Sequence, residues 1–288
     1  MKYLCRALPV LLMAGAVVGS AVVALAGPAG AVGSAGTVTY GSQPLQTVTI
    51  YPSKTPDAPV VVLIHGGGFG SSAEDAASVA SYAKLLQSQH ASTFIVNYRD
   101  DKTDPAFPDE VDDVVTGTQW VLAHAAEFNG NPGNLGIVGG SSGGLLVGDA
   151  VEQLDAAAPG TVNTVLTISS TGNLAMALSY WSTRGGKAGT KHLSNLLPAL
   201  GCSSVATCPA PLEQQWSPDQ HLTSAECPSH WLIYETHKDY LPSAGTEAMH
   251  TALVDAGCSV SDTLLNGSSH GYSLFPYVEP SFLADIGL

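Results

Sequence analysis

The segment IVGGSSGGLL, residues 137–146, places two adjacent serines between two pairs of glycines. It follows an apolar run typical of a strand and opens a stretch with helical spacing. A serine on a strained strand-to-helix turn projects its hydroxyl above the sheet, and flanking glycines avoid collisions with the strand and the helix. The G-x-S-x-G pattern fits twice, around Ser141 and around Ser142. The same pattern also occurs in flexible Gly/Ser loops. The hypothesis that one of these serines is a nucleophile therefore requires partner residues elsewhere in the chain.

A second glycine-rich segment, HGGGF at residues 65–69, ends another apolar run. Acyl transfer passes through a tetrahedral oxyanion, which backbone N–H groups stabilise best where no Cβ blocks their approach. We expect Gly67 and Gly68 to supply such groups, together with the N–H of the residue after the nucleophile. A phosphate-binding loop is disfavoured, since no Lys-Ser/Thr pair follows and the G-x-G-x-x-G spacing is missing. We expect His65, at the end of this run, to be structural.

A serine hydroxyl is a poor nucleophile until a neighbouring base takes its proton. His270 lies in the polar segment GSSHGYSLF just after a predicted strand, where a doubly wound sheet exposes its functional loops. A carboxylate must then fix the imidazole tautomer and stabilise its charged form. The segment LIYETHKDYLP offers Asp239 as the preferred carboxylate and Glu235 as the second choice. The resulting order Ser–Asp–His is the chain order of the α/β-hydrolase fold.

The elements that must position these residues follow from the apolar pattern. Continuous apolar runs predict strands buried on both faces at 60–68, 92–99, 134–141, 164–169 and 230–236. Helical spacing lies between them at 73–89, at 108–128, from residue 142 onward and at 245–257. This alternation predicts an α/β fold with a doubly wound, mostly parallel sheet and an antiparallel hairpin at one edge, near 37–52.

Residues 171–228 interrupt the alternation, because they are rich in Gly, Ser, Pro and Ala and show weak periodicity. A segment of that length without an obvious element is typical of a functional insertion. We expect a small lid or cap there. Within it, residues 174–181 predict a short helix that either faces a pocket or packs on the core.

The N-terminal residues 1–31 predict a secretory signal peptide: a basic start with Lys2 and Arg6, an apolar run, and small-residue cleavage patterns ending at Ala26 and Ala31. A membrane anchor is the alternative, since the run is about long enough to span a bilayer. No basic flank follows it, however, so we expect no stable membrane anchor. Residues 32–288 are expected to form a single secreted domain.

The charge of the chain limits its possible partners, and its cysteines indicate disulfide bonds. The chain has 24 acidic and 10 basic residues, a net charge of −14, so its surface repels nucleic acid and anionic lipid. Cys5 falls in the N-terminal segment, and the four remaining cysteines suggest disulfides in a secreted chain. We favour Cys202–Cys208, which closes a small loop, and Cys227–Cys258, which joins segments preceding neighbouring strands; free thiols are the alternative. Zinc is not expected, because no clustered Cys/His spacing occurs.

With these motifs in place, the chain resembles the α/β-hydrolase superfamily, and within it the hormone-sensitive-lipase-like bacterial esterases and lipases. HGGGF, VNYR followed by PAFPDEVDDV, FNGNPGNLGIVGGSSGG and SHGY occur in that family's order, over about 60–275. The resemblance implies that Ser141, the third position of GxSxGG, is the nucleophile and that Ser142 donates an oxyanion N–H. The chain departs from the family in a shorter segment after Arg99, in YET before the acid, and in lacking a large N-terminal helical cap.

The expected function is that of a secreted serine hydrolase acting on carboxylic esters, either small molecules or ester groups linked to a polymer. Ser141 would attack, His270 would act as base and Asp239 would orient it. Neither a metal nor an organic cofactor is expected. A peptidase or amidase on the same fold is the alternative within enzymes, and a non-catalytic binding protein is the alternative outside them.

Overall fold

The computed structural model describes residues 33, 35–70, 77–99, 107–208, 214–224 and 227–288. The expected signal peptide, residues 1–31, lies outside this range, as does the start of the expected helix at 73–89. No helix in the described part of the chain is both long and apolar enough to cross a membrane.

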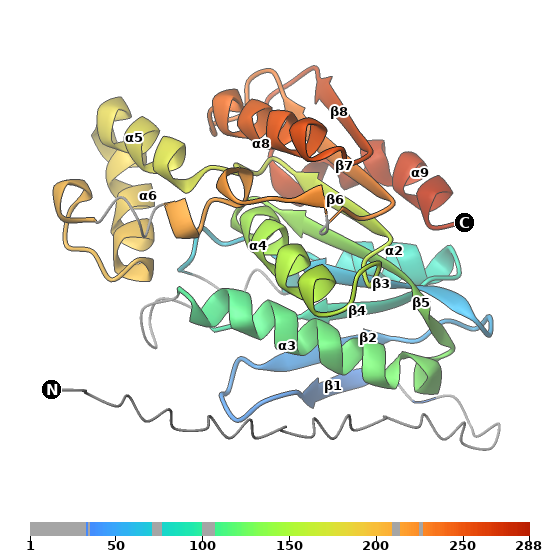
Figure 1. Cartoon of the computed structure of the whole chain (residues 1–288). Coiled ribbons are helices and arrows are strands. Elements are labelled where there is room, and N and C mark those ends of the chain that lie inside the picture. Colours follow the sequence, from blue (N-terminus) through green and yellow to red (C-terminus); the bar gives the residue numbers. More distant parts are fainter. Residues whose placement is uncertain (1–32, 34, 71–76, 100–106, 209–213, 225–226) are drawn as a thin grey trace, which may run out of the picture. The chain divides into compact units, whose positions relative to one another are not determined.

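An eight-stranded sheet forms the centre of the described domain (Figure 1). Its strands are β1 (Gly36–Thr39), β2 (Thr47–Tyr51), β3 (Ala58–Ile64), β4 (Ser92–Val96), β5 (Gly130–Gly140), β6 (Thr164–Ile168), β7 (His230–Thr236) and β8 (Val260–Leu265). They lie in the order β1-β2-β4-β3-β5-β6-β7-β8. Strands β1 and β2 form an antiparallel pair, β2 pairs antiparallel with β4, and all other neighbours are parallel. The predicted mostly parallel sheet with an edge hairpin is confirmed.

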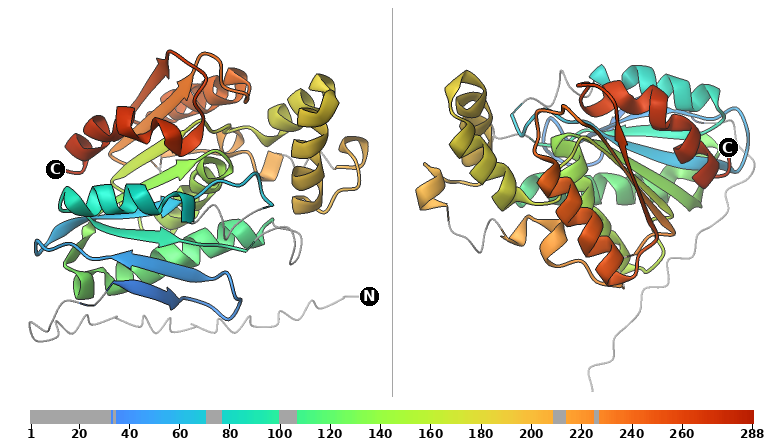
Figure 2. Two further views of the ribbon diagram at one scale, coloured as in Figure 1. Left: turned by 180° about the vertical axis from the view of Figure 1, so that it is seen from behind. Right: turned by 90° about the horizontal axis from the view of Figure 1, so that it is seen from above.

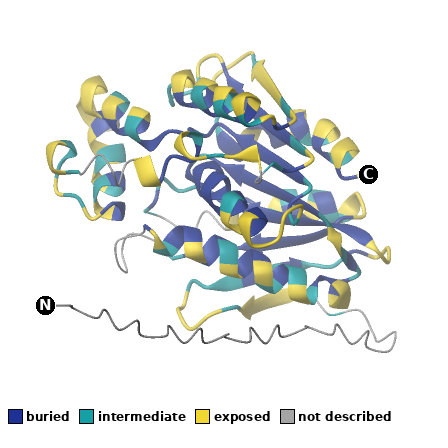
Figure 3. Ribbon diagram, viewed as in Figure 1, coloured by how far each residue is buried: buried dark blue, intermediate teal, exposed yellow. Residues whose placement is uncertain are grey.

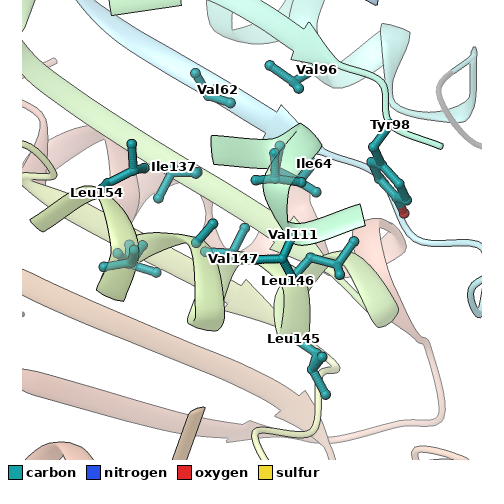
Figure 4. Packing of buried hydrophobic residues seen from close by; sticks show 14 of the residues in the cluster. Val62, Ile64, Val96, Tyr98, Val111, Ile137, Leu145, Leu146, Val147 and Leu154 are labelled. Atoms are coloured by element: carbon teal, nitrogen blue, oxygen red, sulfur yellow. The ribbon is translucent and has the colours of Figure 1, made fainter. Parts of the chain in front are cut away.

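Helices cover both faces of the sheet (Figures 1 and 2). One face carries α3 (Asp109–His124), α4 (Ser142–Ala157) and α8 (Ser243–Ala256), and the other carries α2 (Ala80–Ser88) and α9 (Phe275–Asp285). Successive side chains of a strand point to opposite faces, so β3 feeds both cores. Its Val62 and Ile64 pack with Leu146 on the α4 side (Figure 4), and Leu63 packs with Phe275 on the α9 side.

Burial follows this layered arrangement. All seven residues of β3 and all five of β4 and β6 are buried, which explains why their sequences are continuously apolar rather than alternating. The helices expose their outer surfaces, and the edge strands β1 and β8 are largely exposed (Figure 3). The short 3-10 turns η1 (Ala125–Phe128) and η5 (Gly271–Leu274) connect elements at the sheet ends.

The insertion at 171–228 contains more regular structure than its sequence indicates. Helix α5 (Leu174–Arg184) begins where the Asn173 side chain accepts a hydrogen bond from the Met176 N–H at 2.8 Å, an ordinary N-cap. Helix α6 (Gly186–Ala199) follows at once and lies beside α5 at one end of the sheet (Figures 1 and 2). The sequence pattern predicts the start of α5 and gives no indication of α6. The turns η2 (Val205–Thr207) and η3 (Pro218–Gln220) complete the insertion.

Two disulfides are present, Cys202–Cys208 within the insertion and Cys227–Cys258 between the segments that precede β7 and β8. This is the pairing that the sequence favoured.

The strand order reverses its direction at β3. From β3 the chain continues to β4 on one side, whereas β5 lies on the other side of β3. Ligands of open α/β sheets bind outside the carboxyl ends of the strands at such a reversal of strand order. The segment HGGGF leaves β3 there, and Ser141 follows β5 there.

Candidate active site

Ser141 lies on the turn between β5 and α4 with φ 56° and ψ −128°. A side chain other than glycine is strained at positive φ, and such strain clusters at functional sites. The turn is held by hydrogen bonds from the Ser141 N–H to Ile168 O at 2.9 Å and from the Gly144 N–H to Ser141 O at 3.0 Å. Ser142 is the first residue of α4 and is buried.

The glycines around Ser141 are required by close backbone contacts. A Cβ on Gly139 would lie 2.5 Å from the carbonyl oxygen of Gly143, and a Cβ on Gly143 would lie 2.3 Å from that of His65. Backbone atoms cannot move aside as a flexible side chain can, so only glycine fits at either position. The G-x-S-x-G spacing therefore lets α4 begin directly against the end of β3.

Asp239 and His270 meet at the ends of β7 and β8. His270 Nδ1 donates a hydrogen bond to Asp239 Oδ1 at 2.8 Å, with side chains that are 18% and 2% exposed. Burial alone raises the pKa of the Asp239 carboxyl, but hydrogen bonds from His270 and from the Leu241 N–H outweigh it and hold that pKa below its usual value. The carboxylate can only accept, so the proton of neutral His270 lies on Nδ1 and Nε2 carries the lone pair.

Glu235, the second choice for the acid, is bound elsewhere. It is buried at the end of β7, where its Oε2 accepts a hydrogen bond from the Thr246 hydroxyl at 2.8 Å. Burial raises the pKa of this carboxyl. Of the two candidates, Asp239 contacts His270.

Ser141 and His270 line the same cleft. The residue after His270 packs closely over the turn, since a Cβ on Gly271 would lie 4.0 Å from the Cβ of Ser141. In this structure, however, His270 Nε2 accepts a hydrogen bond from the Tyr240 hydroxyl at 2.7 Å. Among the described residues, no hydrogen bond joins Ser141 to His270.

The expected oxyanion donors, Gly67 and Gly68, lie in the loop after β3. Gly67 and Gly68 have φ of 135° and 62°, a conformation that favours glycine. The Gly68 N–H donates to the Ser142 hydroxyl at 3.0 Å, which ties the loop to the start of α4. A Cβ on the adjacent Gly66 would lie 3.0 Å from the Cβ of Ser141. The candidate donors and the candidate nucleophile are therefore neighbours at the N-terminus of a helix, where negative charge is favoured.

His65 is part of the scaffold below this loop. It is fully buried, its Nε2 lies 2.8 Å from Asn97 Oδ1, and its ring stacks on Tyr98 with centroids 4.3 Å apart. The Tyr98 hydroxyl also donates to His65 O at 2.8 Å. These contacts fit the structural role expected of His65.

Two hollows meet at Ser141. The smaller, about 50 Å³, is largely apolar, and its walls include Leu174, Ala177, Trp181, His192 and Leu196 of the insertion. The larger, about 640 Å³, is open and more polar, with Tyr82, Lys191, Asn195, His270 and Ser273 among its walls. Gly68, Ser141, His192 and Tyr240 line both.

Three further residues shape this region and were not predicted from the sequence. Tyr240 contacts the candidate base, and His192 of α6 lines both hollows. The Tyr272 hydroxyl donates to Ile64 O at 3.0 Å and to Val138 O at 2.9 Å, which fastens the loop that carries His270 to the ends of β3 and β5. Tyr272 belongs to the SHGY motif and could have been singled out there. Within the described residues, no group of three or more His, Cys, Asp or Glu side chains is arranged to hold a metal ion.

Comparison with known proteins agrees with the observed fold. The BD-FAE family model matches residues 48–173. An esterase of Thermogutta terrifontis shares the fold with a TM-score of 0.65 at 19% identity, covering 88% of this chain and 94% of that one. The chain has the α/β-hydrolase fold. A truncated carbohydrate esterase from gut microbiota is similar in the same way, with a TM-score of 0.68 at 18% identity over 88% of this chain and 95% of that one.

Sequence similarity to a curated relative is confined to part of the chain. Carboxylesterase NlhH of Mycobacterium tuberculosis is 33% identical over 110 residues, which are 38% of this chain and 34% of the relative. The match thus spans about a third of the length of that relative. Together with the family model, it confirms the resemblance to hormone-sensitive-lipase-like esterases that the motifs indicated.

Proposed function

We propose that this protein is a secreted serine esterase that cleaves carboxylic esters through a covalent acyl-enzyme intermediate. One observation carries the proposal: buried, ionised Asp239 holds Nδ1 of His270 at 2.8 Å, beside a serine on a strained turn. This pairing makes Nε2 the basic atom at the mouth of the cleft. The similarity to a carboxylesterase and to solved esterases supports esters as the substrates.

The reaction follows from the positions of these groups. Ser141 Oγ attacks the ester carbonyl carbon while His270 Nε2 takes its proton, and Asp239 stabilises the imidazolium that forms. N–H groups from Gly67 and Ser142 stabilise the oxyanion, and the Gly68 N–H joins them once it turns away from the Ser142 hydroxyl that accepts it in this structure. The carbonyl re-forms as the C–O bond to the alcohol breaks, and Nε2 returns its proton to the leaving oxygen. Water then attacks the acyl-enzyme by the same steps, which releases the carboxylic acid and regenerates the serine.

The two serines have environments that support Ser141 as nucleophile. Ser141 has the strained backbone of an elbow and lines both hollows. Ser142 is buried, and its hydroxyl oxygen already accepts the Gly68 N–H. A buried hydroxyl in that position supports the loop rather than attacking substrate.

The sizes of the two hollows support a short acyl group. A protein cavity of about 150 Å³ accommodates benzene, and the apolar hollow here is about 50 Å³. That space suits an acyl chain of a few carbons. The alcohol would then lie in the open cleft of about 640 Å³, whose mixed polar walls tolerate a large group, either a small molecule or part of a polymer.

Two disulfides support export, because such bonds persist in oxidising compartments. We accordingly propose that residues 1–31 are a signal peptide and that residues 32–288 form the mature single domain, with 171–228 as its lid.

Covalent labelling tests the proposal most directly. The purified protein should react with a fluorophosphonate probe at Ser141, identified by peptide mass spectrometry, and Ser141→Ala should not react. Ser142→Ala should still label, because its nucleophile is intact. The p-nitrophenyl esters of acetate and butyrate should be hydrolysed faster than the octanoate, and the matched p-nitroanilides should be poor substrates.

Absence of labelling in the wild-type protein would refute serine catalysis. Labelling that survives Ser141→Ala but not Ser142→Ala would move the nucleophile by one residue. Anilide hydrolysis as fast as that of the esters would favour a peptidase or amidase instead.

A further inference from the structure

Tyr240 makes an unusual contact with the base of the site. It directly follows Asp239 in the chain, and its hydroxyl lies 2.7 Å from His270 Nε2. Its ring lies against the imidazole, with centroids 4.0 Å apart and planes inclined by 37°. Because the Nδ1 proton of His270 is given to Asp239, Nε2 can only accept here, and the tyrosine hydroxyl is the donor.

This contact conflicts with the reaction. The Nε2 lone pair must accept the Ser141 proton during attack, and a ring nitrogen has a single lone pair in the plane of the ring. While the Tyr240 hydroxyl holds it, Ser141 cannot be activated. The hydroxyl must therefore leave Nε2 before or during acylation.

We propose that Tyr240 is a positioning residue that gates His270: its hydroxyl occupies Nε2 in the free protein, and its ring supports the imidazole once the hydroxyl has moved away. The second role follows from the face contact, because an aromatic face attracts a cation within about 6 Å of its centroid. Proton transfer turns His270 into such a cation. The inference rests on the proposed serine esterase mechanism.

The position of Tyr240 is linked to the lid helices. Its ring stacks on His192 of α6 with centroids 5.3 Å apart, and His192 stacks on Trp181 of α5 at 4.0 Å. Burial, followed by the positive charges of Lys191, His270 and Arg184, lowers the pKa of His192, which disfavours a second cation against the Tyr240 ring.

All three rings of this stack also line the small apolar hollow. An acyl group that enters the hollow therefore contacts Tyr240, the residue whose hydroxyl donates to His270 Nε2. Filling of the hollow and release of the base are coupled through Tyr240, which makes this residue a determinant of which esters activate the site.

Two substitutions separate the hydroxyl from the ring. Tyr240→Phe keeps the ring and removes the competing hydrogen bond, so fluorophosphonate labelling of Ser141 should be about fivefold faster, the factor for one ordinary hydrogen bond. Tyr240→Leu removes both, so labelling should be about fivefold slower than in the Phe variant. Tyr180→Phe is the matched control, since it deletes a phenol hydroxyl of α5 that binds Arg184 outside both hollows. Its labelling rate should equal that of wild type.

The outcomes are distinct. Labelling of Tyr240→Phe at or below the wild-type rate would overturn the gating role. Equal rates for the Phe and Leu variants would overturn the supporting role of the ring. Thermal melts of each variant identify any that has lost its fold, and the comparison is made among those that melt within a few degrees of wild type. If neither the wild type nor any variant labels, the esterase mechanism itself fails, rather than the role of Tyr240.

Discussion

Replacing Asp239 by asparagine removes the charge of the acid and keeps its shape. In a serine hydrolase triad this exchange can present the amide NH₂ to the histidine, which inverts the tautomer and costs about 10⁴ in kcat. Here the same oxygen, Asp239 Oδ1, accepts both the His270 Nδ1–H at 2.8 Å and the Leu241 N–H at 3.0 Å. An NH₂ group cannot replace that oxygen, because it would face a backbone donor. The asparagine oxygen should therefore stay toward His270, with the amide NH₂ in the position of the buried Asp239 Oδ2.

The asparagine variant should then lose only the electrostatic stabilisation that the carboxylate gives to the His270 imidazolium. Two unit charges about 4 Å apart attract by about 4 kcal/mol at an effective dielectric constant of 20. That energy stabilises the imidazolium in the transition state, so Asp239→Asn should lower kcat/KM about a thousandfold. Asp239→Ala loses the orienting hydrogen bond as well, worth about 1 kcal/mol, so it should be about fivefold less active than the asparagine variant.

Both variants can be assayed with p-nitrophenyl acetate at pH 8, with Ser141→Ala as the background. Long-range ¹⁵N NMR of the histidine side chains reads the tautomer directly and should show the proton of His270 on Nδ1 in Asp239→Asn. An asparagine variant no more active than the alanine variant, or a proton on Nε2, would refute the reasoning about Leu241.

Two further predictions concern stability. Glu235→Gln should be at least as stable as wild type at pH 8. Burial raises the pKa of Glu235 in the folded protein, so the stability of the wild type falls as the pH rises above the usual glutamate pKa. At pH 4, where Glu235 is protonated, the wild type and the variant should have the same stability. A melting-temperature difference that grows toward acid would contradict this. Removing Cys227–Cys258, which spans 31 residues, should cost about 3.7 kcal/mol by loop entropy, against about 2.2 kcal/mol for Cys202–Cys208, which spans 6. Urea unfolding of the two double-serine variants measures both, and equal losses would contradict the loop-length argument.

The sheet could be predicted because its inner strands β3, β4 and β6 are buried on both faces. Runs such as PVVVLI are apolar at every position, which is typical of a strand covered by helices on both faces. Two helices escaped prediction for local reasons. Helix α6 begins GKAGTK, a sequence of low helical propensity. Helix α9 contains Pro276 and Pro280, which suggest a loop, yet Phe275 and Phe282 anchor it against the sheet. In both cases the surrounding packing outweighs the local sequence.

Some residues of the candidate site could also be predicted from the sequence, and others could not. Polar residues that follow neighbouring parallel strands gather at the carboxyl edge of the sheet, so Ser141, the acidic segment and His270 could be named in advance. The choice between Asp239 and Glu235 could not, because both follow the same strand within a few residues. One of them turns toward His270 and the other toward Thr246. The path of the loop after β7 decides this, and no local pattern encodes it.

By itself, the sequence determined the chemistry that this protein can carry: a serine between glycines, a histidine and carboxylates after strands, and glycines where a backbone must approach closely. These are local requirements, set by the conformation of one residue and its immediate neighbours. Only the tertiary structure decided which groups are within hydrogen-bond distance, above all that Tyr240 rather than Ser141 holds Nε2 of His270. A hydrogen bond weakens steeply once its atoms are more than about 3.2 Å apart, and separations that fine depend on how whole helices and loops pack.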